Sequence, residues 1–388
     1  MVVTSQLKYD QKNVRKYHYF LLLSLIQKHK KISRSQLAEL TRMSNTTVGK
    51  IVKELIQDEL VIESGQEKGE VGRKAIFLEI NPHGAYIIGI EIDVVSVQIA
   101  LVSLNGTVLT KRQFKSEEKG KPEVVLDKVA SEISLLLEET DPKYDEKIIA
   151  IGLTMAGLVT WPEGKALMVP QFQWNEVEIK EYLQSRLMYD VYVDNHVRSI
   201  LLAESLFGTI KNYKDAVCIH VGSGVGGAVM INGEISRGTC NTLGEIGHIT
   251  MEPNGQLCDC GRLGCLQTFI CSSELEKYAQ VPIEEIFIAY DKEEEWSKNL
   301  IDRAKKYLGI TIANVICMYN PEVVLLAGPM IEDYPILLED IEQITDEHMW
   351  KPLKRTFKLA HSTIGKDSGV IGASALVLNE FLRQSRIE

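Results

Sequence analysis

Residues 244–267 read GEIGHITMEPNGQLCDCGRLGCLQ and place one histidine and three cysteines within 18 residues. Thiolates and imidazole are ligands that suit Zn²⁺, and four protein ligands leave no open position for a water molecule. The pattern therefore predicts one structural zinc ion and not a catalytic one. The alternative is a group of buried thiols without a metal. The predicted ligands are His248, Cys258, Cys260 and Cys265.

The remaining cysteines are scattered along the chain, and the total of seven is odd. This usage is typical of metal binding in a reducing compartment and not of a disulfide framework. The length of 388 residues predicts two or three domains. The longest apolar run near the N-terminus, 20–26, is far shorter than the ~18–20 residues of a membrane span. We therefore expect a cytoplasmic protein with no membrane association.

Charge is distributed unevenly along the chain. Residues 1–80 carry 14 Lys and Arg against 9 Asp and Glu, a net charge of +5. Because the whole chain has 43 basic and 53 acidic residues, the rest carries 29 against 44, a net charge of −15. A basic first segment on an acidic remainder predicts a nucleic-acid-binding domain joined to a domain of another kind.

The basic segment has the pattern of a helix-turn-helix. Apolar residues spaced by three and four predict a helix over 13–29. Ser33, three residues before a glutamine, and Ser44 can cap two further helices. The second helix would turn Leu37 and Leu40 inward. The inner face of the third helix would hold Val48, Ile51, Val52 and Leu55.

Two short strands, 60–62 and 75–80, follow these helices and are joined by a polar, glycine-rich loop. Such a hairpin after a helix-turn-helix is a wing, whose basic tip would meet phosphate or a narrow minor groove. Short polar side chains and one glycine on the third helix would fit the major groove. The alternative is a helical bundle whose hairpin packs on the rest of the protein. The predicted DNA contacts are Ser35, Asn45, Thr46, Thr47, Gly49, Lys50, Lys53, Arg73 and Lys74.

Beyond a linker at 81–84 the hydrophobic pattern becomes that of an α/β protein, with strands and helices in alternation. Within it, the glycine-rich stretch 222–227 follows the buried strand 216–221. Glycines at this place could cradle a phosphate with backbone N–H groups. A tight hairpin between two strands explains them equally well.

The motif at 244–248, followed by Cys258 to Gln267, resembles the signature of the ROK family, which groups bacterial repressors and sugar kinases. A helix-turn-helix head occurs in the family's repressors and not in its kinases, so the chain is similar to the branch of xylose and N-acetylglucosamine repressors. The resemblance implies an actin-like, hexokinase-like α/β body with a sugar cleft between two lobes. We assign residues 1–80 to the winged helix-turn-helix domain, 85–195 plus 369–388 to the first lobe, and 196–368 to the second lobe with the zinc motif.

Two departures from the family's kinases predict that this chain does not phosphorylate sugars and is not an enzyme. The kinases bind ATP phosphates on an Asp-x-Gly-Gly-Thr turn, whereas the matching residues 91–95 read Glu-Ile-Asp-Val-Val. Side chains fill the place of close backbone approach, and Asp93 would repel a triphosphate. The kinase general base follows an asparagine, and His196 stands there after Asn195. Two requirements for phosphoryl transfer are therefore missing.

The resemblance also implies a ligand site in which some positions are retained and some are changed. Asn195, Glu245 and His248 match residues that bind sugar hydroxyls, whereas two family carboxylates are replaced by His196 and Gln267. Amide and imidazole groups donate as well as accept, so the site could prefer a ligand with an acceptor or an anionic group, such as a sugar phosphate or sugar acid. A free monosaccharide and no sugar at all are the alternatives. The predicted ligand-binding residues are Gln171, Asn195, His196, Glu245, His248 and Gln267.

Three aromatic residues, Trp161, Phe172 and Trp174, flank this region and would either stack on a sugar ring or pack in the core.

The sequence thus predicts a zinc-containing homodimeric or homotetrameric repressor of carbohydrate genes, which binds a two-fold operator in double-stranded DNA. A sugar-type effector would alter the angle or spacing of the two heads. Control by a protein partner, a repressor without an effector, and a sugar kinase with a DNA-binding head are the alternatives.

Overall fold

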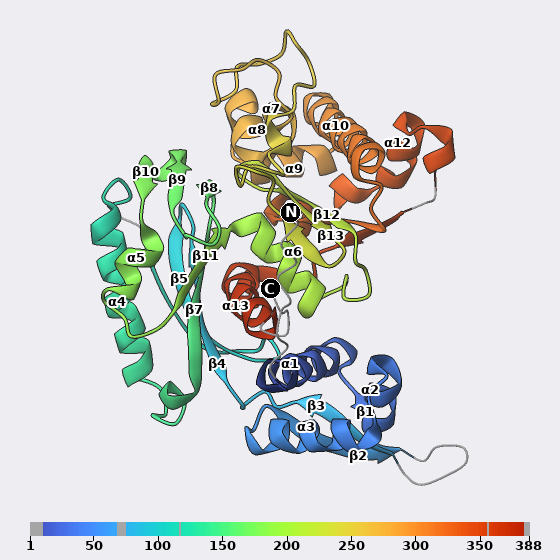
Figure 1. Cartoon of the computed structure of the whole chain (residues 1–388). Coiled ribbons are helices and arrows are strands. Elements are labelled where there is room, and N and C mark those ends of the chain that lie inside the picture. The colour runs from blue at the N-terminus through green and yellow to red at the C-terminus, as the bar shows by residue number, and fades with distance from the viewer. Residues whose placement is uncertain (1–10, 68–74, 116–117, 355–356, 384–388) are drawn as a thin grey trace, which may run out of the picture.

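The computed structural model describes residues 11–67, 75–115, 118–354 and 357–383. Figure 1 shows a small N-terminal head beside a larger body, with the last helix, α13 (Ser368–Arg383), at the centre of the molecule. The predicted winged helix-turn-helix and the two-lobed α/β body are both present. Within the described ranges, no helix is both long enough and apolar enough to cross a membrane.

The head contains three helices and a three-stranded sheet of order β1-β3-β2. Its elements are α1 (Gln11–His29), β1 (Ile32–Ser33), α2 (Arg34–Thr41), α3 (Asn45–Gln57), β2 (Val61–Glu67) and β3 (Ala75–Ile80). β2 extends five residues beyond its predicted end at 62, because β3 supplies antiparallel partners as far as Glu67. The predicted wing-tip contacts Arg73 and Lys74 lie outside the described residues.

Local hydrogen bonds begin both predicted helices of the helix-turn-helix. The Ser33 hydroxyl accepts from the N–H of Gln36 at 3.3 Å, and the Gln36 side chain accepts from the N–H of Ser33 at 2.9 Å. Ser44 Oγ accepts from the N–H of Thr47 at 3.1 Å. These contacts form the predicted capping box and N-cap, and they satisfy backbone donors that the first turn of a helix leaves free.

Hydrophobic burial orients α2 and α3 as expected, with one exception. The predicted inner face of α3 is buried. Leu37 is buried, but Leu40 is 54% exposed, so its predicted inward orientation is wrong. Because Leu37 and Ala38 form the buried side of this two-turn helix, Leu40 falls outside that side.

The first lobe is a five-stranded sheet of order β11-β7-β4-β5-β6, with a small sheet of order β10-β9-β8 beside it. The strands β4, β7 and β11 run parallel. Helix α4 covers one face of the large sheet and α13 covers the other (Figure 1). The elements are β4 (Tyr86–Ile92), β5 (Ser96–Ser103), β6 (Val108–Lys115), α4 (Pro122–Glu138), β7 (Ile148–Met155), β8 (Leu158–Val159), β9 (Ala166–Val169), β10 (Trp174–Val177), α5 (Ile179–Gln184) and β11 (Val191–Asn195).

The second lobe is built on a sheet of order β14-β13-β12-β15-β16, in which β12, β15 and β16 are parallel. Helix α6 connects the two sheets and packs against α13. The elements are α6 (His196–Leu206), β12 (Ala216–Val221), β13 (Val225–Ile231), β14 (Glu234–Ser236), α7 (Gln267–Ile270), α8 (Ser272–Ala279), α9 (Ile283–Asp291), α10 (Glu295–Tyr319), β15 (Val323–Ala327), α11 (Pro329–Glu332), α12 (Ile341–His348) and β16 (Lys358–His361).

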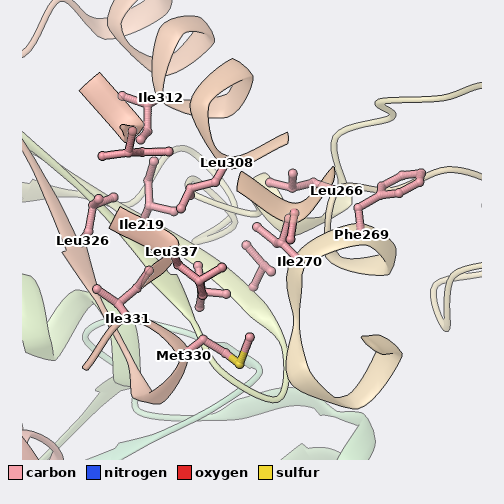
Figure 2. Close-up of a cluster of buried hydrophobic side chains, with 14 of the residues drawn as sticks. Ile219, Leu266, Phe269, Ile270, Leu308, Ile312, Leu326, Met330, Ile331 and Leu337 are labelled. Atoms are coloured by element: carbon pink, nitrogen blue, oxygen red, sulfur yellow. The ribbon is translucent and has the colours of Figure 1, made fainter. Parts of the chain in front are cut away.

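A hydrophobic core fixes the helices of the second lobe to its sheet. Figure 2 shows Ile219 of β12 and Leu326 of β15 together with Leu308 and Ile312 of α10. Leu266 joins the same buried cluster. Since Leu266 directly follows the last predicted metal ligand, this core anchors one end of the loop 248–265, called the metal loop below, to the lobe.

Residues 222–224 of the glycine-rich stretch form the hairpin turn between β12 and β13, and residues 225–227 begin β13, in which Val225 pairs with Val221. The N–H of Gly222 donates to the carbonyl of Gly224 at 2.9 Å, and the carbonyl of Gly222 accepts from the N–H of Ser272 at 2.9 Å. The turn is therefore closed on itself and tied to α8, as the hairpin alternative predicted.

Candidate functional site

Three regions carry the predicted functional residues: the outer face of α3, a loop rich in cysteine, and the region between the lobes where the sugar cleft is expected, called the cleft below. The first is a candidate DNA interface. Among the predicted contacts that the structure describes, Thr47 and Gly49 are half-buried, and the exposed ones are Ser35, Asn45, Thr46, Lys50 and Lys53.

Gly49 is the most informative position on α3. A glycine within a helix costs about 1 kcal/mol relative to alanine, so it usually has a packing reason. A Cβ atom at Gly49 would have no neighbour within 4 Å, so the fold supplies no such reason. The open space at Gly49 lies between the exposed side chains of Thr46 and Lys50, where a nucleic acid backbone or base edge could approach.

The cysteine-rich loop gathers its four predicted ligands at one point. The ligand atoms of His248, Cys258, Cys260 and Cys265 all lie within 4.8 Å of one another. Cys258 Sγ is 3.6 Å from His248 Nδ1, and the Sγ atoms of Cys260 and Cys265 are 3.6 Å apart. Metal–sulfur bonds of ~2.3 Å in a tetrahedron place ligand atoms about 3.8 Å apart, so the spacing fits a metal ion. The cluster could therefore hold one metal ion.

Backbone contacts hold this loop in shape. The N–H of Cys258 donates to the carbonyl of Arg262 at 2.8 Å, and the Arg262 guanidinium donates to the carbonyl of His248. Isolated antiparallel β-bridges pair Thr250 with Cys265 and Leu257 with Leu263. His248 ends a 3-10 turn, Ile246–His248, that starts next to Glu245. The metal loop and a predicted ligand residue are thus mechanically joined.

The cleft brings together residues from β4, α6 and β12. His196 Nδ1 lies 3.2 Å from Glu91 Oε1, and the rings of His196 and His220 meet edge to face with centroids 5.2 Å apart. Burial raises the pKa of Glu91 to about 7 and lowers the pKa of His196. Burial, and then the neighbouring His196, lowers the pKa of His220 to about 3. Both shifts in the Glu91–His196 pair favour a neutral hydrogen bond over an ion pair.

Asn195 uses its side chain within the protein. Its Oδ1 caps α6 by accepting from the N–H of Val197 at 2.9 Å, and its Nδ2 donates to the carbonyl of Gly157 at 3.0 Å. Because Oδ1 also accepts from the N–H of Arg198 at 3.4 Å, only Nδ2 keeps a further hydrogen-bonding position. Asn195 is thus a structural cap first, and a ligand would share it.

A buried charge network lies directly beside Asn195. Asp194 Oδ1 accepts from Arg198 Nη1 at 3.1 Å, and its Oδ2 accepts from Arg237 Nε at 3.0 Å. The Arg237 guanidinium lies over the Trp161 ring, 4.4 Å from its centroid. Asn241 joins the network because its carbonyl accepts from Arg198 and its Oδ1 accepts from the N–H of Trp161 at 3.3 Å. This network links the two walls of the cleft.

The other predicted ligand residues are less closely gathered. Glu245 is exposed to solvent. Partial desolvation of its carboxyl nevertheless raises its pKa, although the nearby His248 and Arg198 act to lower it. Gln171 is exposed in the 3-10 turn Pro170–Phe172, and Gln267 is half-buried at the start of α7.

The flanking aromatic residues divide into two kinds. Phe172 and Trp174 are fully buried and pack edge to face with ring centroids 5.2 Å apart, so core packing explains them. The indole of Trp174 donates to the carbonyl of Lys119 at 2.7 Å. Trp161 is half-buried at the charge network.

Sequence reasoning missed His220, Asp194, Arg198 and Arg237. His220 is the penultimate residue of a strand that the sequence did predict. The carboxyl ends of parallel strands form the ligand-binding edge of an α/β sheet, which is a usable signal for such a residue. Arg237 follows the short strand β14 and has no comparable pattern in the sequence.

A winged helix-turn-helix head on a two-lobed α/β body with a four-ligand loop defines a class of DNA-binding regulators. The profile of winged helix-turn-helix DNA-binding domains matches residues 20–62, and the profile of the ROK family matches residues 87–380. The chain therefore belongs to the ROK family, as its motifs predicted.

Relatives of known name align over almost the whole chain. The xylose repressor of Bacillus spizizenii is 29% identical over 378 residues, which cover 96% of this chain and 98% of that protein. The DNA-binding transcriptional dual regulator NagC of Escherichia coli is 29% identical, with 94% of each chain covered. A solved ROK transcriptional regulator, described as a homologue of the E. coli MLC protein, matches with a TM-score of 0.82, 26% identity and 96% and 98% coverage.

A glucokinase from Streptomyces griseus, solved with glucose and AMPPNP, shares the fold with a TM-score of 0.66 and 20% identity. That likeness covers 75% of this chain and 99% of the glucokinase. The hexokinase-like body is therefore common to regulators and kinases.

Proposed function

We propose that this protein is a transcriptional repressor of carbohydrate-utilisation genes whose operator affinity responds to a sugar or sugar derivative bound between the lobes. One observation carries the proposal. A capped recognition helix with an exposed polar face, α3, belongs to the same chain as a ROK body that aligns end to end with proteins named as xylose and N-acetylglucosamine repressors. Xylose genes are the first candidates for regulation.

The ligand would bind beside the buried network of Asp194 and Arg237. Glu245 and His248 would bind hydroxyl groups, and Trp161, over whose ring the Arg237 guanidinium lies, would border the site. Gln171, His196 and Gln267 would supply donors where the family's kinases have other groups. A ligand with an acceptor or anionic group, such as a sugar acid or sugar phosphate, suits these donors best.

Phosphoryl transfer is not part of the proposed function. In the turn that corresponds to the kinase phosphate loop, Asp93 Oδ2 accepts from the N–H of Val95 at 3.1 Å. The aspartate thus occupies a backbone donor that a phosphate would need, and its charge opposes an anion. His196, in the place of the general base, is held against Glu91 and His220.

The metal loop would hold one structural Zn²⁺. Three thiolates and an imidazole are the ligand set of structural zinc sites, and the four donor atoms already lie within 4.8 Å of one another. His248 Nδ1 lies 3.6 Å from Cys258 Sγ, so binding of the ion through Nδ1 would leave Nε2 for a ligand. The ion would therefore rigidify the loop that carries Glu245 and His248 and would not take part in chemistry.

Operator recognition would use a homodimer or homotetramer, in which two heads read a two-fold site in the cytoplasm, where the chromosome lies. The outer face of α3 would contact bases, and Arg73 and Lys74 would contact phosphates. We retain 1–80 as the DNA-binding domain, 85–195 plus 369–388 as the first lobe, and 196–368 as the second lobe.

Operator binding tests the proposal directly. The purified chain is titrated onto the promoter of its own gene at fixed salt, alone and with free sugars, sugar phosphates and sugar acids. We expect sequence-specific binding that one class of compound weakens by tenfold or more. Binding that no compound disturbs would contradict the effector site, and failure to bind the promoter better than unrelated DNA would contradict the repressor function.

A further inference from the structure

The last helix of the body packs directly against the first helix of the DNA-binding head. Phe20 of α1 and Phe381 of α13 meet edge to face, with ring centroids 5.3 Å apart and an interplanar angle of 87°. Ile26 of α1 and Leu378 of α13 belong to the same buried cluster, and Figure 1 shows the two helices adjacent. A freely tethered domain has a core of its own. The core of this head instead continues into the body through residues of α13.

The linker between head and body is also packed. The N–H of Asn81 donates to the carbonyl of Leu60 at 2.9 Å, and its side-chain amide donates to the carbonyl of Glu59 at 2.6 Å. Lys147 of the body donates to the Glu59 carboxylate at 2.5 Å. A Cβ atom on Gly84 would overlap the carbonyl of Glu59, so the chain passes close to the head here. The linker therefore does not act as a flexible tether.

The other end of α13 lies at the cleft. Gly369 sits so close to the Glu91 carboxylate that a Cβ atom there would overlap it, and Glu91 is the partner of His196. One turn further along, a Cβ atom on Gly372 would lie 3.0 Å from Cβ of Ser199 in α6. One helix thus contacts the first lobe, the start of α6 and the head.

We propose that α13 positions the DNA-binding head, with Phe20 and Phe381 as positioning residues that set the orientation of α3 relative to the body. In a dimer this orientation would fix the spacing of the two half-sites that can be bound together. The inference rests on the proposed repressor function.

The dimensions of α13 suit this role. A helix of 16 residues is about 24 Å long and moves as one unit when it is packed on both sides. A change of lobe angle at Gly369 would therefore reach Phe20 through a rigid element. A head released from α13 would still read a half-site, because α3 keeps its own caps and inner face. It would no longer present two heads at a fixed separation, so binding to the full site would weaken.

The test compares three DNAs for the full-length chain: the site mapped by footprinting in its own promoter, the same site with five base pairs inserted at its centre, and an isolated half-site. Five base pairs rotate the half-sites by about half a helical turn. Wild type should lose most of its affinity on the insertion. Phe381→Ala should bind the half-site as wild type does, bind the mapped site at least about tenfold more weakly, and discriminate little against the insertion.

Two variants separate positioning from a general loss of stability. Phe381→Leu keeps an apolar contact with Phe20 and should retain most of the discrimination. Phe287→Ala removes a buried aromatic of the second lobe, whose ring stacks on Tyr334 at 3.7 Å, and should keep the full wild-type discrimination. If wild type binds the promoter and folded Phe381→Ala still discriminates against the insertion as wild type does, the role of α13 would be overturned while the repressor function would stand. A wild-type chain that ignores the promoter would overturn the repressor function as well.

Discussion

The metal loop and the interlobe cleft lie close together, but they are built in opposite ways. The loop takes its four candidate ligands from 18 consecutive residues, whereas the cleft takes Glu91, His196, His220 and Arg237 from four segments of the chain. The loop depends on spacing that a short stretch carries by itself. The cleft depends on the relative position of two sheets and the helix between them. Substitutions in the two regions should therefore fail in different ways.

Cys260→Ser should have the largest effect, because it removes one of the four proposed ligands of the metal loop. Structural zinc sites in small peptides bind with about 10–16 kcal/mol, so loss of one of four ligands should abolish tight binding. We expect the metal content to fall from one ion per chain to nearly none, with a lower unfolding temperature. Cys317→Ser, which changes an exposed cysteine on α10, is the matched control. Equal metal content in both variants would refute the ligand assignment.

Asp194→Asn should cause the next largest loss, since it leaves two arginines beside the cleft without their shared counter-charge. Asp194 and Arg198 are both buried, and breaking a buried ion pair typically costs about 3–5 kcal/mol. Chemical denaturation should report a loss of this size. Asp127→Asn breaks an exposed pair with Arg186 and should change the unfolding free energy little. Similar losses in the two variants would show that the network does not hold the cleft together.

Glu91→Gln should increase the stability of the folded protein at high pH but not at low pH. Because burial raises the pKa of Glu91 to about 7 from its ordinary 4.5, the folded protein binds this proton more tightly than the unfolded chain. Wild-type stability should therefore fall as the pH rises from 4.5 to 7. The neutral glutamine should be more stable than wild type by roughly 1–3 kcal/mol at pH 8 and no more stable near pH 4.

Glu322→Gln is the opposite control for Glu91→Gln. Hydrogen bonds from the N–H groups of Lys214 and Asp215 lower the pKa of the Glu322 carboxyl. Its contribution is therefore present at neutral pH and is lost as the pH falls through its folded pKa, so the glutamine variant should be less stable than wild type at neutral pH only. Parallel pH profiles for the two variants would contradict the buried environment of Glu91.

Gly49→Ala should have the smallest effect on stability. It extends the comparison to α3, which, like the metal loop, is built from consecutive residues. The helix should gain about 0.5–1 kcal/mol, because the new Cβ atom meets nothing in the protein. Operator affinity should nevertheless fall, by about tenfold. Gly309→Ala in α10 should behave in reverse, because its Cβ atom would lie 2.6 Å from Ile344. The Gly309→Ala variant should destabilise the fold and leave the operator affinity of the folded protein unchanged. If Gly49→Ala bound the operator with normal affinity, Gly49 would not be part of the DNA interface.

The features that the sequence predicted well are those with a short repeat or a short contact range. Caps at Ser33 and Ser44 depend on residues three positions away, and the inner face of α3 follows from spacings of three and four. The error at Leu40 arose because burial at the end of a two-turn helix depends on what packs there, and spacing alone does not contain that information.

The sequence by itself determined the winged head, the α/β body, the family and the gathering of four histidine and cysteine side chains that could hold a metal, because hydrophobic periodicity, capping and residue spacing are local properties. Only the tertiary structure decided that His220 and Glu91 meet His196, that Asp194 binds two arginines, and that α13 joins the cleft to the head. These contacts join segments up to hundreds of residues apart. Their geometry follows from how the two sheets pack around α6 and α13, which no short stretch of sequence specifies.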